Sequence, residues 1–316
     1  MRWARPGGVA AVRRSMEEPM DVVEGVSRFV TVNGVRLHVM EFGPAEGPPV
    51  LLLHGFPEFW WGWRSQIGPL ARGGFRVWAA DQRGYNLSDK PRGTAAYTQD
   101  VLADDAAGLL EAMGGGPAAL VGHDWGAAIA WRVAVRYPHL LSRLVVMDVP
   151  HPTVMEAALR HNPAQLRRSW YIFAMQAPWL PERQLRADGF RRLVKAVRDG
   201  AKPGSFSEAE IEEYRRAWSQ AGALHAMLTW YRAAVRRRAA PFTRPRVEAP
   251  TLILWGADDK YVLADLARQS ADLCDRARLE ILPGATHWLH HEESELVNRL
   301  LLEFLREEPA AESARR

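Results

Sequence analysis

Six short runs of apolar residues alternate with amphipathic segments along this chain of 316 residues, and they constrain its fold more than any other feature. Apolar residues occupy successive positions in these runs, as expected for strands covered on both faces in a parallel sheet wrapped by helices. A segment of alternating pattern precedes them and contains Asn33-Gly34, a two-residue hairpin signal. The pattern predicts an α/β protein with a mostly parallel, doubly wound sheet. The runs read PVLLLHG, FRVWAAD, AALVGHD, LSRLVVMDVP, PTLILWG and ARLEILPG.

The alternation stops in the middle of the chain. Residues 151–242 are helical in pattern, rich in Arg, Trp and Ala, and contain no convincing strand. We expect them to form a helical lid inserted into a core made of residues 26–150 and 243–316. Such a lid would cap the carboxyl edge of the sheet, where ligands bind in open α/β sheets.

Charge and composition exclude several classes of protein. The net charge is +4 and the pI about 9.4, but the basic residues are scattered or lie on one helix face, so no nucleic-acid partner is expected. No apolar run approaches the ~20 residues of a membrane span. Residues 1–25 lack the apolar segment of a secretory signal and are expected to be a flexible extension, with Met16 and Met20 as alternative starts. The single cysteine, Cys274, is expected to be buried, and a cytoplasmic location is expected.

The segment GHDWGA places Asp124 between a predicted strand and a predicted helix, flanked by Gly122 and Gly126. This is the strand-turn-helix elbow of many hydrolases, with aspartate in place of the serine nucleophile. The amino terminus of the following helix favours a negative charge at this position. The alternative interpretation is a helix cap, because aspartate is a good N-cap residue.

The segment HGFPEFWWGW follows the first apolar run and predicts a loop beside the elbow. The backbone N–H groups of Phe56 and Trp125 could together form an oxyanion hole. The Phe56-Pro57 bond is a candidate for the cis form, which would aim the loop inward. We interpret His54 as a structural residue that fixes this loop rather than as a catalytic one.

The segment LPGATHW places His287 in a loop after the last predicted strand, where the base of a nucleophile–acid–base set would lie. Asp259, three residues after Gly256 in LILWGADDKYV, is our choice for the acid that orients His287. Its neighbour Asp258 is an alternative. Asp148, at the end of the adjacent strand, is a second alternative.

An aspartate nucleophile suits displacement at saturated carbon. A serine attacking such a carbon would leave an ether, which water does not readily cleave, whereas a carboxylate leaves an ester. The ester carbonyl belongs to the enzyme, so His287 can activate a water molecule to attack it while the oxyanion hole stabilises the developing charge. The sequence therefore favours an epoxide or a haloalkane as substrate.

The leaving group distinguishes these two substrates. An opening epoxide releases an alkoxide, which needs acidic O–H donors such as tyrosine, whose ordinary pKa is about 10. Tyr171 and Tyr231 lie among aromatic residues of the predicted lid, and from spacing alone either could be a packing residue instead. Tyr214, in EIEEYRRAW, is expected on the surface of a helix, and the adjacent His290 and His291 are also expected to be exposed.

Together these motifs resemble the α/β-hydrolase-fold epoxide hydrolases, over almost the whole chain from Val26 to Leu305. The resemblance implies an α/β-hydrolase fold with a helical lid, and hydrolysis of a small apolar epoxide by water without a cofactor or metal. It also implies a set of site residues: Asp124 as nucleophile, Asp259 as acid, His287 as base, and Tyr171 and Tyr231 as ring-opening acids. The motifs that carry it are HGFPE, DQRGYNLSDKP, GHDWGA, WYIFAMQAPWLPE, WYR, WGADD and GATHW.

Several positions depart from related patterns. Haloalkane dehalogenases usually have a halide-binding asparagine where this chain has Phe56, and fluoroacetate dehalogenases typically have arginine where it has Trp125. Both departures favour epoxide hydrolysis over the alternative of a haloalkane dehalogenase. Asn86 stands where many relatives have glycine. The other alternative, a non-catalytic small-molecule receptor, conflicts with the apparently complete catalytic set. An apolar, aromatic-rich pocket is indicated by Trp60, Trp61, Trp63, Trp170 and Trp179.

Overall fold

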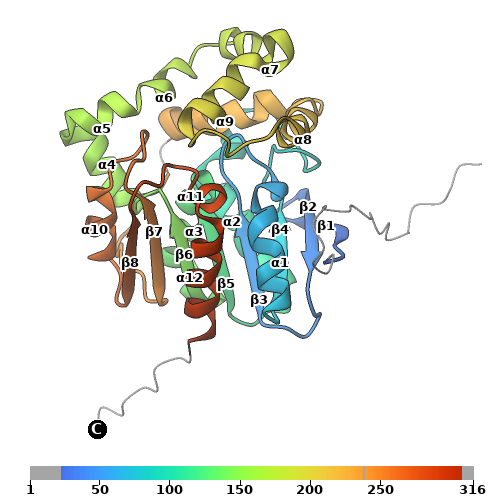
Figure 1. The fold of residues 1–316 in the computed structure, drawn as a ribbon. Helices are drawn as coiled ribbons and strands as arrows, with labels where there is room; N and C mark the ends of the chain where they lie inside the picture. The colour runs from blue at the N-terminus through green and yellow to red at the C-terminus, as the bar shows by residue number, and fades with distance from the viewer. Residues whose placement is uncertain (1–22, 238, 308–316) are drawn as a thin grey trace, which may run out of the picture.

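A computed structural model describes residues 23–237 and 239–307, so most of the expected N-terminal extension, with Met16 and Met20, lies outside the described residues. Its centre is an eight-stranded sheet in the order β1-β2-β4-β3-β5-β6-β7-β8 (Figure 1). The strands from β4 across to β8 pair in parallel, which confirms the predicted mostly parallel sheet. The strands are β1 (Val26–Val32), β2 (Val35–Phe42), β3 (Pro49–Leu53), β4 (Arg76–Ala80), β5 (Ala118–His123), β6 (Leu141–Met147), β7 (Thr251–Gly256) and β8 (Ala277–Leu282).

The predicted hairpin joins β1 to β2. Asn33 and Gly34 form its turn with φ angles of 46° and 73°, and Val32 pairs with Val35 beside it. Both turn residues need the left-handed region that asparagine and glycine tolerate best, which is why this dipeptide closes the hairpin. β2 then pairs antiparallel with β4 and attaches the hairpin to the parallel part of the sheet.

Helices cover both faces of this sheet. α1 and α12 pack on one face, and α2, α3 and α10 pack on the other. The helices of the two layers are α1 (Arg64–Arg72), α2 (Gln99–Ala112), α3 (Trp125–Arg136), α10 (Asp265–Ala271), α11 (Leu289–Glu292) and α12 (Ser294–Arg306), with short 3-10 helices η1 (Trp60–Trp63), η2 (Thr94–Tyr97) and η3 (Pro138–Leu140).

The two-sided cover explains why the strand sequences do not alternate between apolar and polar residues. In β3, Leu51 and Leu53 belong to the core cluster beneath α2 and α3, whereas Val50 and Leu52 belong to the cluster beneath α1 and α12. Every position of a central strand therefore faces a packed layer, and an apolar residue is favourable at each one. Cys274 is buried in the first cluster, as expected.

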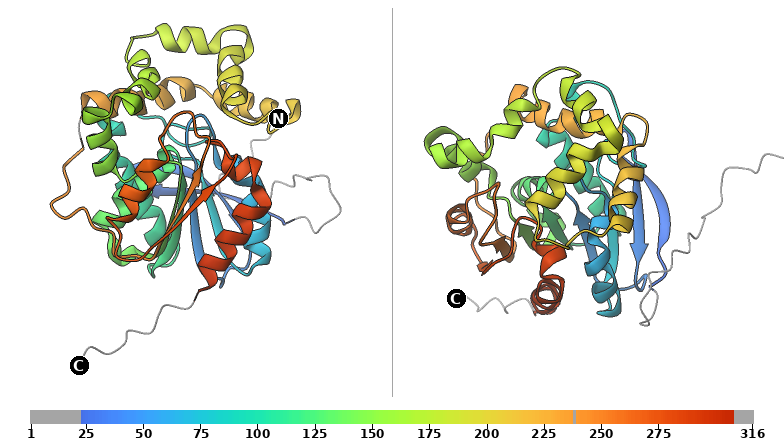
Figure 2. Two further views of the ribbon diagram at one scale, coloured as in Figure 1. Left: turned by 60° about the vertical axis from the view of Figure 1, so that its left-hand side comes forward. Right: turned by 45° about the horizontal axis from the view of Figure 1, so that its top comes forward.

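Six further helices follow one another between β6 and β7 and lie over the carboxyl ends of the strands (Figures 1 and 2). The described residues of the 151–242 segment contain no strand. The division of the chain into a core and a lid stays a prediction, and we use the word lid for these helices. No helix among the described residues is long and apolar enough to cross a membrane. The lid helices are α4 (Pro152–His161), α5 (Pro163–Arg168), α6 (Trp170–Ala174), α7 (Leu180–Gly200), α8 (Glu208–Trp218) and α9 (Ala223–Arg236).

Candidate active site

Asp124 occupies a sharp turn between β5 and α3, with φ 49° and ψ −121°. Glycines on both sides allow the turn to pack closely. A Cβ atom on Gly126 would lie 1.9 Å from the carbonyl oxygen of Leu53, and one on Gly122 would lie 2.4 Å from that of Gly126. The Asp124 side chain makes no capping hydrogen bond to α3, so its position is not explained by a helix cap.

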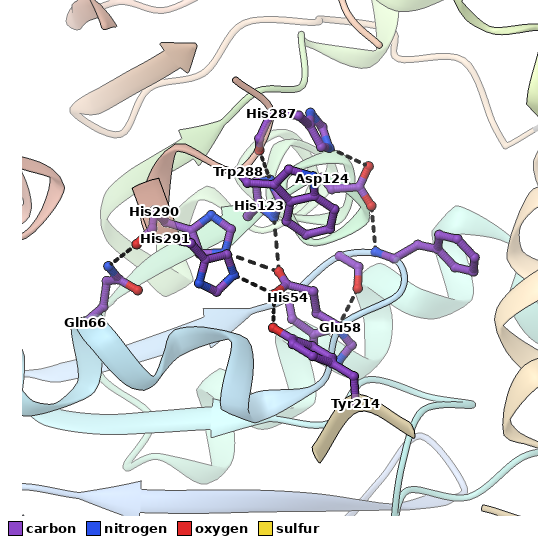
Figure 3. Close-up of polar contacts among 12 residues, drawn as sticks. His54, Glu58, Gln66, His123, Asp124, Tyr214, His287, Trp288, His290 and His291 are labelled. Carbon is purple, nitrogen blue, oxygen red and sulfur yellow. Dashed lines mark hydrogen bonds and ion pairs between the residues drawn. The ribbon is translucent and has the colours of Figure 1, made fainter. Parts of the chain in front are cut away.

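The carboxylate of Asp124 lies between a loop N–H group and an imidazole (Figure 3). The backbone N–H of Phe56 donates to Asp124 Oδ1 at 2.7 Å. Asp124 Oδ2 lies 3.5 Å from His287 Nε2. The N–H of Trp125 belongs to the first residue of α3, where backbone donors have no acceptor within the helix. The structure thus brings the predicted nucleophile, base and oxyanion-hole residues together.

His287 is held from its other nitrogen by Asp259. His287 Nδ1 lies 2.9 Å from Asp259 Oδ2. The second oxygen, Asp259 Oδ1, accepts the backbone N–H groups of Tyr261 at 2.6 Å and Val262 at 3.0 Å. These donors leave Oδ2 directed at the imidazole. Asp258 is exposed, so of these two neighbouring aspartates only Asp259 faces the histidine.

Asp148, the other alternative, lies beside this pair. It directly follows β6 and adopts φ 56°, and its Oδ1 accepts the backbone N–H of Gly256 at 2.8 Å. Its second oxygen is buried and has no hydrogen-bond partner among the described residues. Burial, followed by the nearby Asp259 carboxylate, raises the pKa of Asp148 well above its ordinary value. Asp259, and not Asp148, is therefore the carboxylate that is hydrogen-bonded to His287.

The charges of Asp124 and His287 support each other. Burial acts to raise the pKa of Asp124, but the contacts with His287, together with His123 and the N–H of Phe56, outweigh it, and the pKa is lowered. Burial alone would lower the pKa of His287, but Asp259 and Asp124 raise it well above 6.5. The site therefore favours an ionised nucleophile beside a histidine whose basicity depends on that same charge.

Two tyrosines from different lid helices face the elbow. The ring of Tyr231, on α9, packs edge-on against Trp125 at 5.1 Å and against Phe56 at 5.2 Å. The ring of Tyr171, on α6, lies 6.0 Å from that of Tyr231. Burial, followed by the charge of Asp124, raises the pKa of both tyrosines well above 10. Both side chains therefore remain O–H donors at neutral pH.

A third tyrosine that we did not single out completes this side of the site. The ring of Tyr261 lies 5.8 Å from that of Tyr171 and 5.1 Å from the imidazole of His287. Tyr261 lies two residues after Asp259 in LILWGADDKYV. This closeness to the predicted acid was the feature of the sequence that could have identified it as a site residue.

Sequence reasoning missed a buried polar cluster beneath the elbow, and three expectations about it were wrong. Tyr214, His290 and His291 were expected at the surface, but all three side chains are buried around Glu58. The Glu58 carboxylate accepts the Tyr214 hydroxyl at 2.6 Å and contacts Nε2 of His291 at 2.7 Å and of His290 at 3.2 Å (Figure 3). His123 Nδ1 lies 3.4 Å from Glu58. These partners outweigh burial and lower the pKa of Glu58 well below its ordinary value.

The cluster reaches the active site through His123. Its Nε2 contacts the backbone carbonyl of His287 at 2.8 Å, so the residue before the predicted nucleophile holds the loop that carries the predicted base. The sequence pattern did not predict the burial of Tyr214. Charged residues surround it in EIEEYRRAW, although α8 buries Tyr214 on its inner face.

Two groups of the described residues have ligand atoms close enough to hold a metal ion: Glu58 with His290 and His291, and His123 with Asp148 and His287. In the first group, the carboxylate already accepts hydrogen bonds at the distances given above, and hydrogen bonding accounts for that arrangement without an ion.

The loop at His54 has the structural histidine we expected. His54 Nε2 accepts the backbone N–H of Gln82 at 3.1 Å, and Nδ1 lies 2.9 Å from the carbonyl oxygen of Gly55. The Phe56-Pro57 bond is cis, as expected. Asn86 adopts φ 36°, a left-handed conformation that asparagine tolerates and that accounts for its place at a position where glycine is common.

The five tryptophans taken as signs of a pocket do not share one environment. Trp63 is buried beneath α1 and Trp60 and Trp61 are partly buried in the core. Trp170 and Trp179, in contrast, are largely exposed on the lid, which corrects the expectation that they line a pocket.

Comparisons with known proteins agree with this geometry. Residues 48–294 match the sequence family described as the alpha/beta hydrolase fold. The chain is 42% identical to the AB hydrolase superfamily protein YfhM of Bacillus subtilis, over 90% of this chain and 99% of that protein. It is 36% identical to human Epoxide hydrolase 4, over 87% of this chain and 77% of that protein.

Solved structures give the same result. The epoxide hydrolase of Bacillus megaterium in complex with an inhibitor superposes with a TM-score of 0.82 at 33% identity, over 89% of this chain and all of that one. The α/β-hydrolase sheet, the aspartate in the turn between β5 and α3 and the relatives named above lead to one conclusion. The chain belongs to the α/β-hydrolase fold family and, within it, to the epoxide hydrolases.

Proposed function

We propose that this protein converts small apolar epoxides into vicinal diols through a covalent ester on Asp124. The observation that carries the proposal is the position of the Asp124 carboxylate. One of its oxygens is held by a backbone N–H group, and the other faces the imidazole of His287. The rings of Tyr231 and Tyr171, from two helices of the lid, lie beside Trp125 and beside each other, and their hydroxyl groups are the proposed proton donors for the substrate oxygen.

In the first step, a free oxygen of Asp124 attacks one carbon of the epoxide ring. A C–O bond of the ring breaks, and the released oxygen takes a proton from Tyr171 or Tyr231. Oδ2 is the better candidate for the attacking oxygen, because Oδ1 already accepts the N–H of Phe56 at 2.7 Å. Oδ1 then becomes the carbonyl oxygen of the ester and stays in the oxyanion hole.

In the second step, His287 removes a proton from a water molecule, and the hydroxide attacks the Asp124 carboxyl carbon. The N–H groups of Phe56 and Trp125 stabilise the charge on the former carbonyl oxygen. The bond between the carboxyl carbon and Oδ2 breaks, so Oδ2 leaves as a hydroxyl oxygen of the diol and Asp124 keeps one oxygen from water. The two protons of the water molecule end on that hydroxyl oxygen and on the tyrosinate. Asp259 orients the imidazole and stabilises its charge.

The order of these steps fits the electrostatics of the site. Asp124 helps to raise the pKa of His287 while it is ionised. Ester formation removes that negative charge, so the pKa of His287 falls when a base is needed. The tyrosines, whose pKa values are raised in part by Asp124, become better acids at the same moment.

Haloalkane dehalogenation is the competing activity, because it would use the same nucleophile and base. A departing halide needs N–H donors, whereas an alkoxide needs proton donors. The side chain at position 56 is a phenyl ring packed against Tyr231 and offers no donor. The lid tyrosines supply O–H groups instead, and this favours the epoxide.

Repeated turnover in ¹⁸O-water tests the proposal. Incubation with styrene oxide or an aliphatic epoxide should give a diol, and label should accumulate in the peptide that contains Asp124. A diol without label in that peptide would refute the ester mechanism, and halide release from 1-bromobutane with no diol from any epoxide would favour dehalogenation.

A further inference from the structure

Contrary to the scattered distribution that we expected, the net positive charge of this protein is concentrated on the lid. Residues 160–198 contain nine arginines and lysines but only two acidic residues, Glu182 and Asp188. This segment alone therefore has a formal charge of +7, whereas the whole chain has +4. The rest of the chain is slightly acidic, and the lid is a strongly basic surface on it.

Four of these cations are available for a partner. The arginines 167, 183, 186 and 192 are exposed, and none of them forms an ion pair or side-chain hydrogen bond within the described residues. Elsewhere in the segment the cations are paired, as in the contacts of Arg191 with Asp188 and of Lys195 with Asp199. The unpaired arginines flank the stretch that joins α5 to α7.

Large apolar side chains are exposed in the same stretch. Eight such side chains are exposed among the described residues, and five of them lie within residues 166–180. Their exposed fractions are 43% for Leu166, 67% for Trp170, 54% for Phe173, 66% for Trp179 and 41% for Leu180. Exposed tryptophan at this density is uncommon on a protein surface and marks an interaction site.

These side chains point away from the sheet. On α6, Tyr171 contacts the rings of Tyr231 and Tyr261 inside the protein, while Trp170 and Phe173, one turn apart, share the outer side. Figure 1 shows α7 at the top of the lid, farthest from the strands, and α5 at its left edge. We call the exposed apolar residues between 166 and 180, together with the four unpaired arginines, the lid face.

We propose that the lid face binds the surface of an anionic lipid bilayer. Tryptophan favours the interface between headgroups and acyl chains, because its ring is apolar and its N–H is polar. Arginines around such anchors are attracted by anionic headgroups. A second copy of this chain fits less well, since a symmetric interface would oppose two surfaces of the same positive charge.

Vesicle co-sedimentation tests the proposal without any substrate, so its result is independent of the catalytic proposal. The protein should bind vesicles of phosphatidylcholine with phosphatidylglycerol at least tenfold more tightly than vesicles of phosphatidylcholine alone. Raising the salt to about 0.5 M should weaken this binding, because exposed charges are then screened. Equal or absent binding to the two vesicle types would overturn the proposal.

Matched variants separate the two contributions. Trp170→Ser with Trp179→Ser should reduce vesicle binding tenfold or more, and Arg183→Gln with Arg186→Gln should reduce it by about fivefold per arginine on the anionic vesicles. The apolar control is Phe29→Ser, which removes an exposed ring from β1, at the edge of the sheet.

The charge control is Arg276→Gln with Arg299→Gln, which removes two exposed arginines that lie outside the lid. Neither control should alter binding. If both controls weaken binding as much as the lid variants do, or if light scattering shows that the lid face forms a dimer instead, the inference is wrong.

Discussion

Replacement of the base, His287→Gln, should convert this protein into one that captures its substrate and releases it slowly. The variant keeps Asp124, the N–H of Phe56 and both lid tyrosines, so the first step retains its parts. Glutamine cannot accept the proton of the attacking water. General base catalysis typically contributes a factor of roughly 10² to 10⁴. The barrier to ester hydrolysis should therefore rise by about 2.7 to 5.4 kcal/mol.

These magnitudes fix the time available for detection. If the wild type turns over at about 10 s⁻¹, a typical enzyme value, the variant hydrolyses its ester at roughly 10⁻¹ to 10⁻³ s⁻¹. The half-life of the ester is then roughly 7 s to 12 min by the same arithmetic. The variant is mixed with excess epoxide and quenched with acid within a few seconds. Its intact mass should then be higher by the mass of one epoxide.

Two controls identify the attachment point. Asp124→Asn should show no adduct, and Cys274→Ser should leave the adduct of the His287→Gln protein in place, because Cys274 is buried away from the elbow. Peptide mapping should locate the added mass on Asp124. An adduct that persists in Asp124→Asn, or a His287→Gln variant with full diol production, would falsify the assignment of nucleophile and base.

Three other outcomes follow from the same contacts. Tyr171→Phe and Tyr231→Phe should each slow ester formation by about 10²-fold or more, which is the loss typical of an acid catalyst. Single-turnover kinetics would measure this rate, and a fully active double variant would show that the tyrosines are not the acids. Asp124→Asn should lower the pKa of His287, measured by NMR titration of its ring. Because the folded pKa of this histidine lies above its ordinary value, its protonation stabilises the wild type below a pH of about 6.5, and that contribution disappears as the pH rises through the folded pKa. The variant should lose part of this contribution, and an unchanged pKa would contradict the coupling. Tyr214→Phe should cost about 1.5–3 kcal/mol of unfolding free energy in a denaturant titration, since it removes a buried hydrogen bond to a carboxylate, and a cost near zero would mean that the bond contributes little.

Local sequence was sufficient where a structural requirement is local. The Asn33-Gly34 hairpin, the six strands predicted from apolar runs and the glycine-flanked turn at Asp124 each depend on backbone conformation or on the apolar character of consecutive residues. These requirements leave a pattern within a few residues, and the pattern predicted the sheet and the elbow.

The roles of the neighbouring acids depended on long-range packing. Asp258, Asp259 and Asp148 were all candidates from their positions after strands, because parallel strands bring their carboxyl ends to one edge of the sheet. Only the folded chain distinguishes them. Asp258 is exposed, and the second oxygen of the buried Asp148 has no partner in the part of the chain that the structure describes. Asp259 is held by two backbone N–H groups, with its other oxygen toward His287.

What the sequence by itself determined was the α/β architecture, the sharp turn at Asp124 and the identity of the family, because these follow from periodicity and from short motifs. The tertiary structure decided which side chains surround Glu58 and which tryptophans are exposed on the surface of the lid. His290, His291 and Tyr214 lie in polar stretches that resemble a solvated surface, yet they fold inward because a buried carboxylate distant in the sequence needs hydrogen-bond donors. Partners separated by more than 150 residues leave no local pattern, and only packing brings them together.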